Sequence, residues 1–217
     1  MILKPTKPSL SKRLESYLKK DAKFRKVFGA TKREFDASGL VAHNWEHIYR
    51  DTLNAIVIGE AERADMRVVL SAITMHDIGF LYGASGKTHC EVGAAKLPHY
   101  LRKIKVSYSP AITRRIADCI ATHKGSMFQL KPETLEAKVV CDADLLEKFG
   151  PFGVYQTIRT WVEFDKGIES TIVKLRGDNL PYLRMETKTG KKLVTDHAQK
   201  YRKDFASALD RAFEPYR

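Results

Sequence analysis

The sequence predicts an all-α fold, a helical bundle with further helices flanking it at both ends. Apolar residues recur at helical spacing through most of the chain, and glycines and prolines bound these segments. Alternation typical of strands is confined to two short stretches, 105–109 and 182–187. The 217 residues are 43% hydrophobic and 10% aromatic, which excludes a disordered chain and suffices for a buried core.

The N-terminal half is predicted to form four helices. The first is a basic amphipathic segment that begins at Ser9 or Ser11 and ends near Gly29. The fourth is predicted to begin at a capping box formed by Thr88 and Glu91. The four helices are expected over residues 9–29, 45–62, 65–77 and 88–104.

The C-terminal half continues the helical pattern. Ser109 and Pro110 begin one helix, and Gly150 ends the next. The polar stretch 177–190 holds glycines and a proline, and we interpret it as a linker, a surface loop or a lid. The helices of this half are expected over residues 110–124, 132–149, 154–165 and 191–213.

The net charge of +12 is unevenly distributed. Residues 1–34 hold 11 Lys and Arg against 3 Asp and Glu, whereas residues 35–150 hold 14 of each and six of the seven histidines. No apolar run reaches the roughly 20 residues that span a bilayer, and the N-terminus lacks a signal-peptide core. Three cysteines that cannot all pair suit a reducing compartment. We therefore expect a cytoplasmic protein with no membrane association.

Histidines and aspartates lie near the ends of successive predicted helices. They are His47, the dipeptide His76-Asp77, His89, His123, and the pair Asp142 and Asp144. Imidazoles and carboxylates from facing helices can build a metal site in a bundle. A single helical histidine is more often an ordinary hydrogen-bonded residue, but Asp77 ends an apolar run where an unpaired carboxylate would be costly to bury. The combination therefore favours a metal.

A second pattern overlaps the first. His43-Asn44-Trp45-Glu46-His47 matches H-x-x-E-H, in which two histidines bind zinc and the glutamate is the general base of a protease. This zinc-protease interpretation is the remote alternative, because it leaves the His76-Asp77 dipeptide and the later histidines without a role.

The order His … His-Asp … Asp resembles the HD-domain metal-dependent phosphohydrolase superfamily over about residues 43–160. His47 to Arg50 resembles its H-x-x-R element, His76-Asp77 its defining dipeptide, and Asp144 its closing aspartate. The segments around 43–51 and 132–154 are similar to the YedJ-like branch of HD hydrolases. Four positions depart from that branch, which often has Asp, Val, Arg and Asp where this chain has Asn44, Asp51, Leu145 and Glu147.

The resemblance implies that His47, His76, Asp77 and Asp144 bind one divalent metal, Mn, Fe, Ni, Co, Zn or Mg. His89 and His123 are expected either to bind a second metal bridged by Asp77 or to hydrogen-bond a phosphate. Whether Asp142 is a ligand or supports one stays open.

Hydrolysis of a phosphoester by water activated at a metal needs cationic groups near the developing charge. Arg50, Lys87 and Lys124 are the candidates, although both lysines are equally compatible with surface charges. Glu46 is expected to act as an acid or base, or to orient a ligand. Asp77 is expected both to bind the metal and to take part in catalysis.

We therefore expect residues 35–170 to form a phosphohydrolase domain, with residues 1–34 as a basic helical extension packed on it. Residues 171–217 are expected to be a C-terminal helical extension of the same domain. The predicted substrate is a nucleotide or a related small phosphorylated compound. The alternative is a nucleic-acid-binding or regulatory protein on the same scaffold, with the basic N-terminal helix as its contact. The sequence carries no signal for an oligomeric state.

Overall fold

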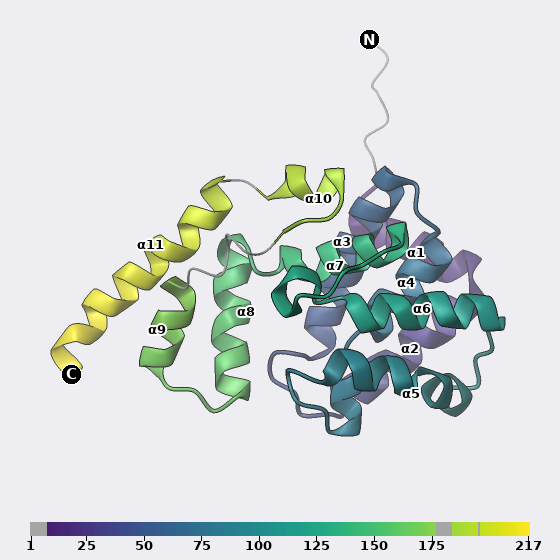
Figure 1. The fold of residues 1–217 in the computed structure, drawn as a ribbon, viewed down its shortest axis with the longest axis horizontal. Helices are drawn as coiled ribbons and strands as arrows, with labels where there is room; N and C mark the ends of the chain where they lie inside the picture. Colours follow the sequence, from purple (N-terminus) through teal and green to yellow (C-terminus); the bar gives the residue numbers. More distant parts are fainter. Residues whose placement is uncertain (1–7, 177–183, 195) are drawn as a thin grey trace, which may run out of the picture.

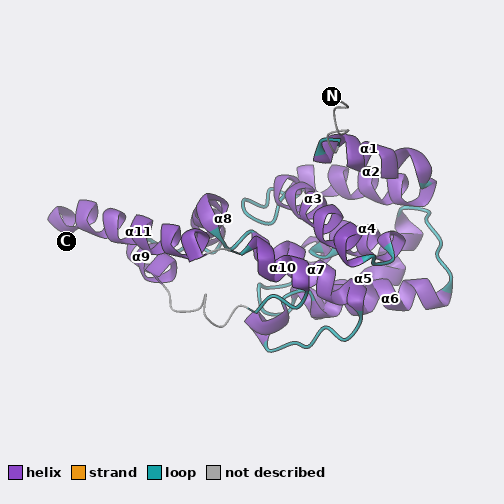
Figure 2. Cartoon of the chain, turned by 90° about the horizontal axis from the view of Figure 1, so that it is seen from above, coloured by secondary structure: helices purple, strands orange, loops and turns teal. Residues whose placement is uncertain are grey.

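The computed structural model describes residues 8–176, 184–194 and 196–217 (Figure 1). These ranges contain helices and no strand (Figure 2), so the all-α prediction is confirmed. The stretch 105–109 and the described part of 182–187 form turns and irregular backbone, and they do not pair as strands. Within the described ranges, no helix combines the length and the apolar character needed to cross a membrane.

Five helices form the core of the molecule. They are α3 (Trp45–Glu62), α4 (Met66–Met75), α5 (His89–Lys103), α6 (Pro110–Thr122) and α7 (Leu135–Leu146). α3 packs against α4 and α7, and α6 packs against α4, α5 and α7. Their inward faces bury a continuous apolar cluster that includes Ile48, Ile73, Leu97, Ile120 and Val140. This packing places the C-terminal ends of α4 and α6 and the N-terminal end of α5 close to the N-terminal half of α3 and the last turn of α7.

Side-chain caps begin several of these helices. Asn44, Ser109 and Thr134 each accept a hydrogen bond from a backbone N–H in the first turn of the helix that follows. The capping box predicted at Thr88 is wrong, because its hydroxyl accepts from the backbone N–H of Ser85 instead.

The N-terminal segment differs from its prediction. Instead of one helix over 9–29, the chain forms α1 (Leu10–Lys20) and α2 (Ala22–Asp36). Asp21 separates them, because its carboxylate accepts from the first N–H groups of α2. Arg13 and Tyr17 of α1 both bind Glu60 of α3, which fixes α1 on the core.

The C-terminal part forms a second group of helices beside the core. α8 (Gly150–Glu163), α9 (Ile168–Arg176) and α11 (Asp196–Phe213) pack against one another, at the left of Figure 1. α9 was not predicted, and the expected helix 191–213 is divided into α10 (Lys188–Leu193) and α11. Three short 3₁₀ helices complete the described chain: η1 (Ile78–Tyr82), η2 (Gly125–Phe128) and η4 (Glu214–Tyr216).

The described part of the predicted linker is packed on the core. Backbone N–H groups of Glu186 and Thr187 donate to Asp142 of α7 at 2.8 Å each. The backbone and hydroxyl of Thr189 both donate to Glu62 of α3, at 2.7 and 2.6 Å. The linker interpretation is therefore wrong for residues 184–190, while residues 177–183 lie outside the described residues.

Close backbone packing at Gly79 connects η1 to the first turn of α5. A Cβ atom at Gly79 would lie 2.1 Å from the carbonyl oxygen of His89, closer than real Cβ contacts allow. Glycine at this position therefore sets the distance between the residues that follow Asp77 and the helix that begins with His89.

We expect Gly79→Ala to lower the free energy of unfolding by about 1–3 kcal/mol, because the added methyl group pushes the two segments apart. Urea denaturation measures this loss. Gly167→Ala is the matched control, since a Cβ atom there meets no described atom within 4 Å. Equal unfolding free energies for wild type and Gly79→Ala would contradict the packing described here.

Candidate metal centre

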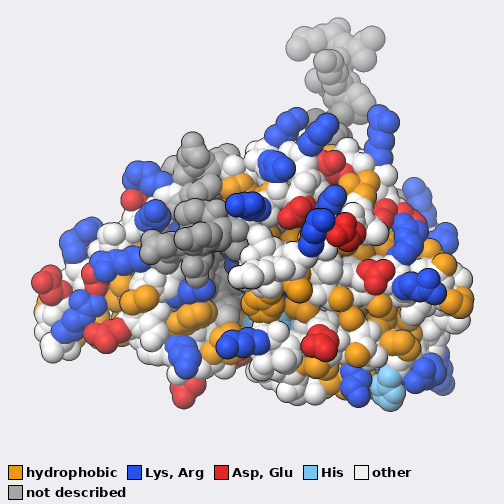
Figure 3. Space-filling view, viewed as in Figure 1, with side chains coloured by type: hydrophobic (Ala, Val, Ile, Leu, Met, Phe, Trp, Pro, Cys, Tyr) orange, Lys and Arg blue, Asp and Glu red, His pale blue; other side chains and the backbone are white. Residues whose placement is uncertain are grey.

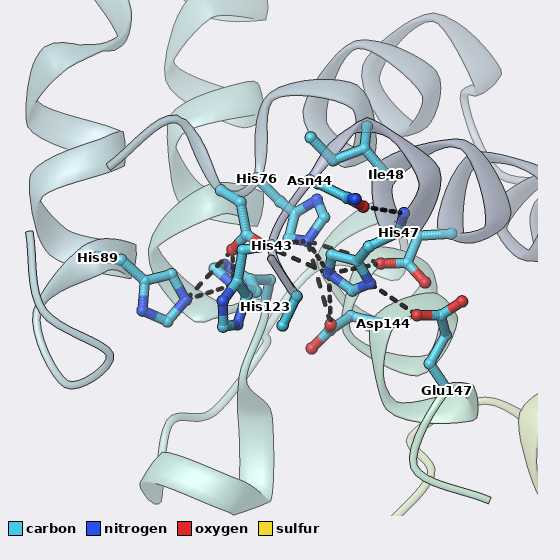
Figure 4. Close-up of polar contacts among 12 residues, drawn as sticks. His43, Asn44, His47, Ile48, His76, His89, His123, Asp144 and Glu147 are labelled. Carbon is cyan, nitrogen blue, oxygen red and sulfur yellow. Dashed lines mark hydrogen bonds and ion pairs between the residues drawn. The ribbon is translucent and has the colours of Figure 1, made fainter. Parts of the chain in front are cut away.

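A buried polar cluster lies where the five core helices meet (Figure 4). Each of its seven side chains is at most 1% exposed. Its members are His47 and Asp51 of α3, His76 and Asp77 after α4, His89 of α5, His123 after α6, and Asp144 of α7. Figure 4 shows His89 and His123 on one side of the cluster, with His47 and Asp144 on the other.

Each imidazole of the cluster is held through its Nδ1 atom. His76, His89 and His123 each hydrogen-bond the carbonyl oxygen three residues earlier in the chain. These acceptors are Ile73 (2.6 Å), Gly86 (3.0 Å) and Ile120 (2.7 Å). Because a carbonyl oxygen only accepts, Nδ1 must carry the proton, and in the neutral ring Nε2 keeps its lone pair. This orientation is typical of metal-binding histidines.

His47 is held by a carboxylate instead. Its Nδ1 lies 2.7 Å from Oε2 of Glu147, and Oε1 of the same carboxylate accepts a hydrogen bond from Nε of Arg50. Burial disfavours the charged imidazole, but the carboxylates of Asp51 and Glu147 hold the pKa of His47 well above its ordinary value. The cluster thus attracts a proton or another cation to Nε2 of His47.

The first half-site lies between α3, α4 and α7. The Nε2 atoms of His47 and His76 are 3.3 Å apart, and each lies 3.3 Å from Oδ2 of Asp77. Oδ1 of Asp144 lies 3.6 Å from Nε2 of His47, and Oδ2 of Asp51 lies 3.2 Å from it. Two imidazoles and three carboxylates therefore surround one point.

The second half-site lies between η1, α5 and the end of α6. The Nε2 atoms of His89 and His123 are 3.0 Å apart, and they lie 3.4 and 3.5 Å from Oδ1 of Asp77. The Sγ atom of Cys90 is 3.5 Å from Nε2 of His89. The two oxygens of Asp77 thus face different half-sites, and this carboxylate connects them.

The donors of both half-sites fit a divalent cation. Both oxygens of Asp51, both oxygens of Asp77 and Oδ1 of Asp144 are buried without a hydrogen-bond partner among the described residues. Unpaired buried carboxylates are costly, and nitrogen lone pairs at 3.0 Å from one another repel. A cation between them removes both costs, and imidazole with carboxylate suits divalent first-row metals.

The charge states of the cluster also suit a metal. Burial lowers the pKa of His89 to about 2 and that of His123 to about 4, so both rings are neutral near pH 7. Burial alone would raise the pKa of Asp77, but His76 and Lys124 hold it well below its ordinary value. Asp51 differs, because burial raises its pKa well above that of a free aspartate.

Lys124 lies beside the cluster and binds one of its carboxylates, whereas Arg50 binds Glu147, the carboxylate that holds His47. The Lys124 ammonium is buried and donates to Oδ2 of Asp144 at 2.9 Å, so it is not a surface charge. Arg50 contacts Glu147 and Gln156, and therefore reaches His47 through Glu147. Lys124 thus fixes the carboxylate of Asp144, and Arg50 fixes the carboxylate that orients the His47 ring.

Glu46 and Lys87 lie away from the cluster. Glu46 is exposed and binds Arg159 at 2.6 Å, so the structure does not give it contact with a ligand. Lys87 is exposed, and its ammonium has no hydrogen bond or ion pair within the described part of the chain. The expected acid–base role of Glu46 and phosphate contact of Lys87 are not supported by this arrangement.

Asp142 points away from the cluster and anchors the segment before α10. Its Oδ2 accepts from the backbone and hydroxyl of Thr187 at 2.8 and 2.6 Å. Burial raises the pKa of Asp142 in spite of these bonds. Both oxygens of Asp142 therefore bind the segment before α10, and Asp142 is not among the residues of the cluster.

The H-x-x-E-H pattern does not assemble. His43 hydrogen-bonds Glu163 of α8, while Glu46 faces Arg159 at the surface. The two histidines and the glutamate therefore do not share one centre, and we reject the zinc-protease alternative.

Sequence reasoning missed three members of this region. Asp51 lies one helical turn after His47, on the same face of α3, and that spacing was the available signal. Glu147 follows Asp144 by three residues and was noted only as a departure from the YedJ-like pattern. Cys90 adjoins His89, and burial raises the pKa of its thiol to about 12.

The comparisons with known proteins agree with this geometry. Residues 44–148 match the sequence profile of the family described as HD domain. Curated sequences give no significant match. The fold is similar to the crystal structure of Bacillus subtilis YpgQ in complex with ADP, with 20% identity, coverage of 87% of this chain and 97% of that chain, and a TM-score of 0.65.

Two further structures share the fold. A protein from Lactobacillus plantarum has 18% identity over 90% of this chain and 98% of its own, with a TM-score of 0.67. An HD-superfamily hydrolase from Bacillus thuringiensis has 20% identity over 89% of this chain and 97% of its own, with a TM-score of 0.63. The similarity to the YedJ-like branch stays a prediction. The profile match identifies residues 44–148 as an HD domain, and the buried His/Asp cluster lies within this domain.

Proposed function

We propose that this protein is a metal-dependent phosphohydrolase that acts on a nucleotide or a related small phosphorylated compound. The HD domain and its His/Asp cluster support a metal-dependent hydrolase in general. The proposal rests on the placement of Asp77, whose two oxygens have no hydrogen-bond partner among the described residues and face two separate pairs of imidazoles.

The chain offers ligands for two metal ions. His47, His76, Asp77 and Asp144 would hold the first, with Asp51 beside them. The other oxygen of Asp77 would serve the second, together with His89 and His123. A divalent metal bound here supplies Lewis acidity, which polarises a phosphoryl oxygen and lowers the pKa of bound water.

The protein's own cations support phosphoryl chemistry. Lys124 brings a buried positive charge to Asp144, next to the first half-site, where the negative charge of a phosphoryl group would develop. Arg50 holds Glu147, and Glu147 in turn fixes the ring of His47. The ADP complex of Bacillus subtilis YpgQ, a protein of similar fold, supports a nucleotide as the substrate.

The nucleic-acid-binding alternative has less support. Arg13 pairs with Glu60, and Arg25 and Lys26 donate to backbone carbonyls, so part of the basic charge of α1 and α2 serves packing. Figure 3 shows Lys and Arg side chains scattered over one face, with acidic side chains among them. A nearly complete set of buried metal donors has no role in a protein that only binds nucleic acid.

We expect the protein, reconstituted separately with Mn, Fe, Co, Ni, Zn or Mg, to hydrolyse at least one compound in a panel of nucleotides, cyclic nucleotides and simple phosphoesters. Asp77→Asn should lower kcat by about 10³-fold, because it removes a charged donor shared by both half-sites. Asp118→Asn, at an exposed aspartate of α6, is the control and should keep wild-type kcat. Absence of turnover with every metal would overturn the proposal and favour the binding alternative.

We also expect two divalent metal ions per chain, measured by elemental analysis after dialysis against Mn²⁺. His123→Ala should retain about one ion, and Asp77→Ala should retain neither, because only Asp77 contributes to both half-sites. His99→Ala, at an exposed histidine of α5, should retain both. Full metal content in Asp77→Ala would contradict the assignment. A single ion in both wild type and His123→Ala would leave His89 and His123 as phosphate contacts.

A further inference from the structure

His43 is the histidine of the H-x-x-E-H pattern that the metal cluster leaves unused, yet it is only 5% exposed. Its Nδ1 atom hydrogen-bonds Oε1 of Glu163, at the end of α8. The other oxygen of Glu163 accepts from the backbone N–H groups of Ala42 (2.7 Å) and His43 (3.2 Å). Three hydrogen bonds therefore fix this carboxylate, and it fixes the imidazole.

Aromatic rings hold the His43 imidazole beside both half-sites. The ring of Phe80 stacks on it at 4.3 Å between centroids, and Phe164 lies on it at 6.0 Å. Its centroid is 5.8 Å from that of His47 in the first half-site and 6.3 Å from that of His89 in the second. His43 therefore lies next to an imidazole of each of the two half-sites that Asp77 connects.

The free nitrogen of this ring is a hydrogen-bond acceptor. Because Nδ1 donates to the Glu163 carboxylate, Nε2 of the neutral ring carries the lone pair. Burial lowers the pKa of His43 although Glu163 opposes this shift, so the ring is neutral near pH 7. Nε2 has no hydrogen-bond partner among the described residues. A phosphate oxygen is itself an acceptor, so the partner that suits Nε2 is the O–H of a water molecule.

We propose that His43 orients the water that attacks the substrate, by accepting a hydrogen bond from it at Nε2, and that Glu163 is the positioning residue for His43. This inference rests on the proposed phosphohydrolase function. Glu163 lies outside residues 44–148, so the C-terminal helices, through α8, complete the site of the HD domain.

A purely structural role for the pair is the competing explanation, and Glu163→Gln separates the two. The carbonyl oxygen of the glutamine would still accept from Ala42 and His43, which turns its NH₂ group towards Nδ1. The contact between α8 and His43 is thereby kept. Nδ1 becomes the acceptor, so the proton moves to Nε2, and the ring offers water a donor instead of an acceptor.

The experiment compares His43→Phe and Glu163→Gln with wild type, using Mn²⁺-loaded protein. His43→Phe keeps an aromatic ring against Phe80 but removes the acceptor. Both variants should retain the wild-type Mn²⁺ content and lose about 10²-fold in kcat on the fastest substrate among ATP, ADP and AMP, with KM changed by less than about threefold. His99→Phe and Glu133→Gln, at exposed positions, are the matched controls and should keep wild-type kcat.

A spectroscopic measurement adds a readout that does not depend on activity. Long-range ¹⁵N–¹H spectra of Zn²⁺-loaded protein should show the His43 proton on Nδ1 in wild type and on Nε2 in Glu163→Gln, with the signals assigned by their loss in His43→Phe. Retention of at least a third of the wild-type kcat in His43→Phe, or an Nε2-protonated His43 in wild type, would overturn the inference. If wild type itself hydrolyses none of the panel, the proposed function fails and the inference fails with it.

Discussion

Asp77 is buried between four imidazoles, and the helices of the core are packed around this carboxylate. Neither oxygen of Asp77 has a hydrogen-bond partner in the described part of the chain, and such a carboxylate costs several kcal/mol in a protein interior unless a cation compensates it. The surrounding helices are arranged so that compensation is possible from two sides. His47 and His76 approach one oxygen, and His89 and His123 approach the other. Metal binding at this cluster would therefore stabilise the folded core.

Local backbone geometry supplies much of this arrangement. His76 and His123 each follow the last residue of a helix, and His89 begins one, so all three can bond the carbonyl three residues earlier. Gly79 then brings η1 against α5, because any larger residue would collide with the carbonyl of His89. The orientation of these three imidazoles thus depends on short-range hydrogen bonds, whereas their convergence depends on helix packing.

The difference between short-range hydrogen bonds and long-range packing explains which features of the structure the sequence could predict. Helix 45–62 follows from local periodicity, and the positions near helix ends indicate candidate histidines and aspartates. The family resemblance implies which of them bind metal, and the structure places all six predicted ligands in one cluster. Glu46 was expected near the metal because it adjoins His47, but adjacent helical residues point about 100° apart, and Glu46 faces solvent. The partners Glu147 and Glu163 lie 100 and 120 residues from His47 and His43, a separation that no local pattern reveals.

We infer that Asp77 connects two metal ions in the buried cluster. Anomalous diffraction from crystals of the Mn²⁺-loaded protein, recorded above the manganese absorption edge, would locate these ions. We expect two anomalous peaks on either side of the Asp77 carboxylate, one among His47, His76 and Asp144 and the other between His89 and His123. Manganese peaks confined to the protein surface, with none next to Asp77, would contradict this inference.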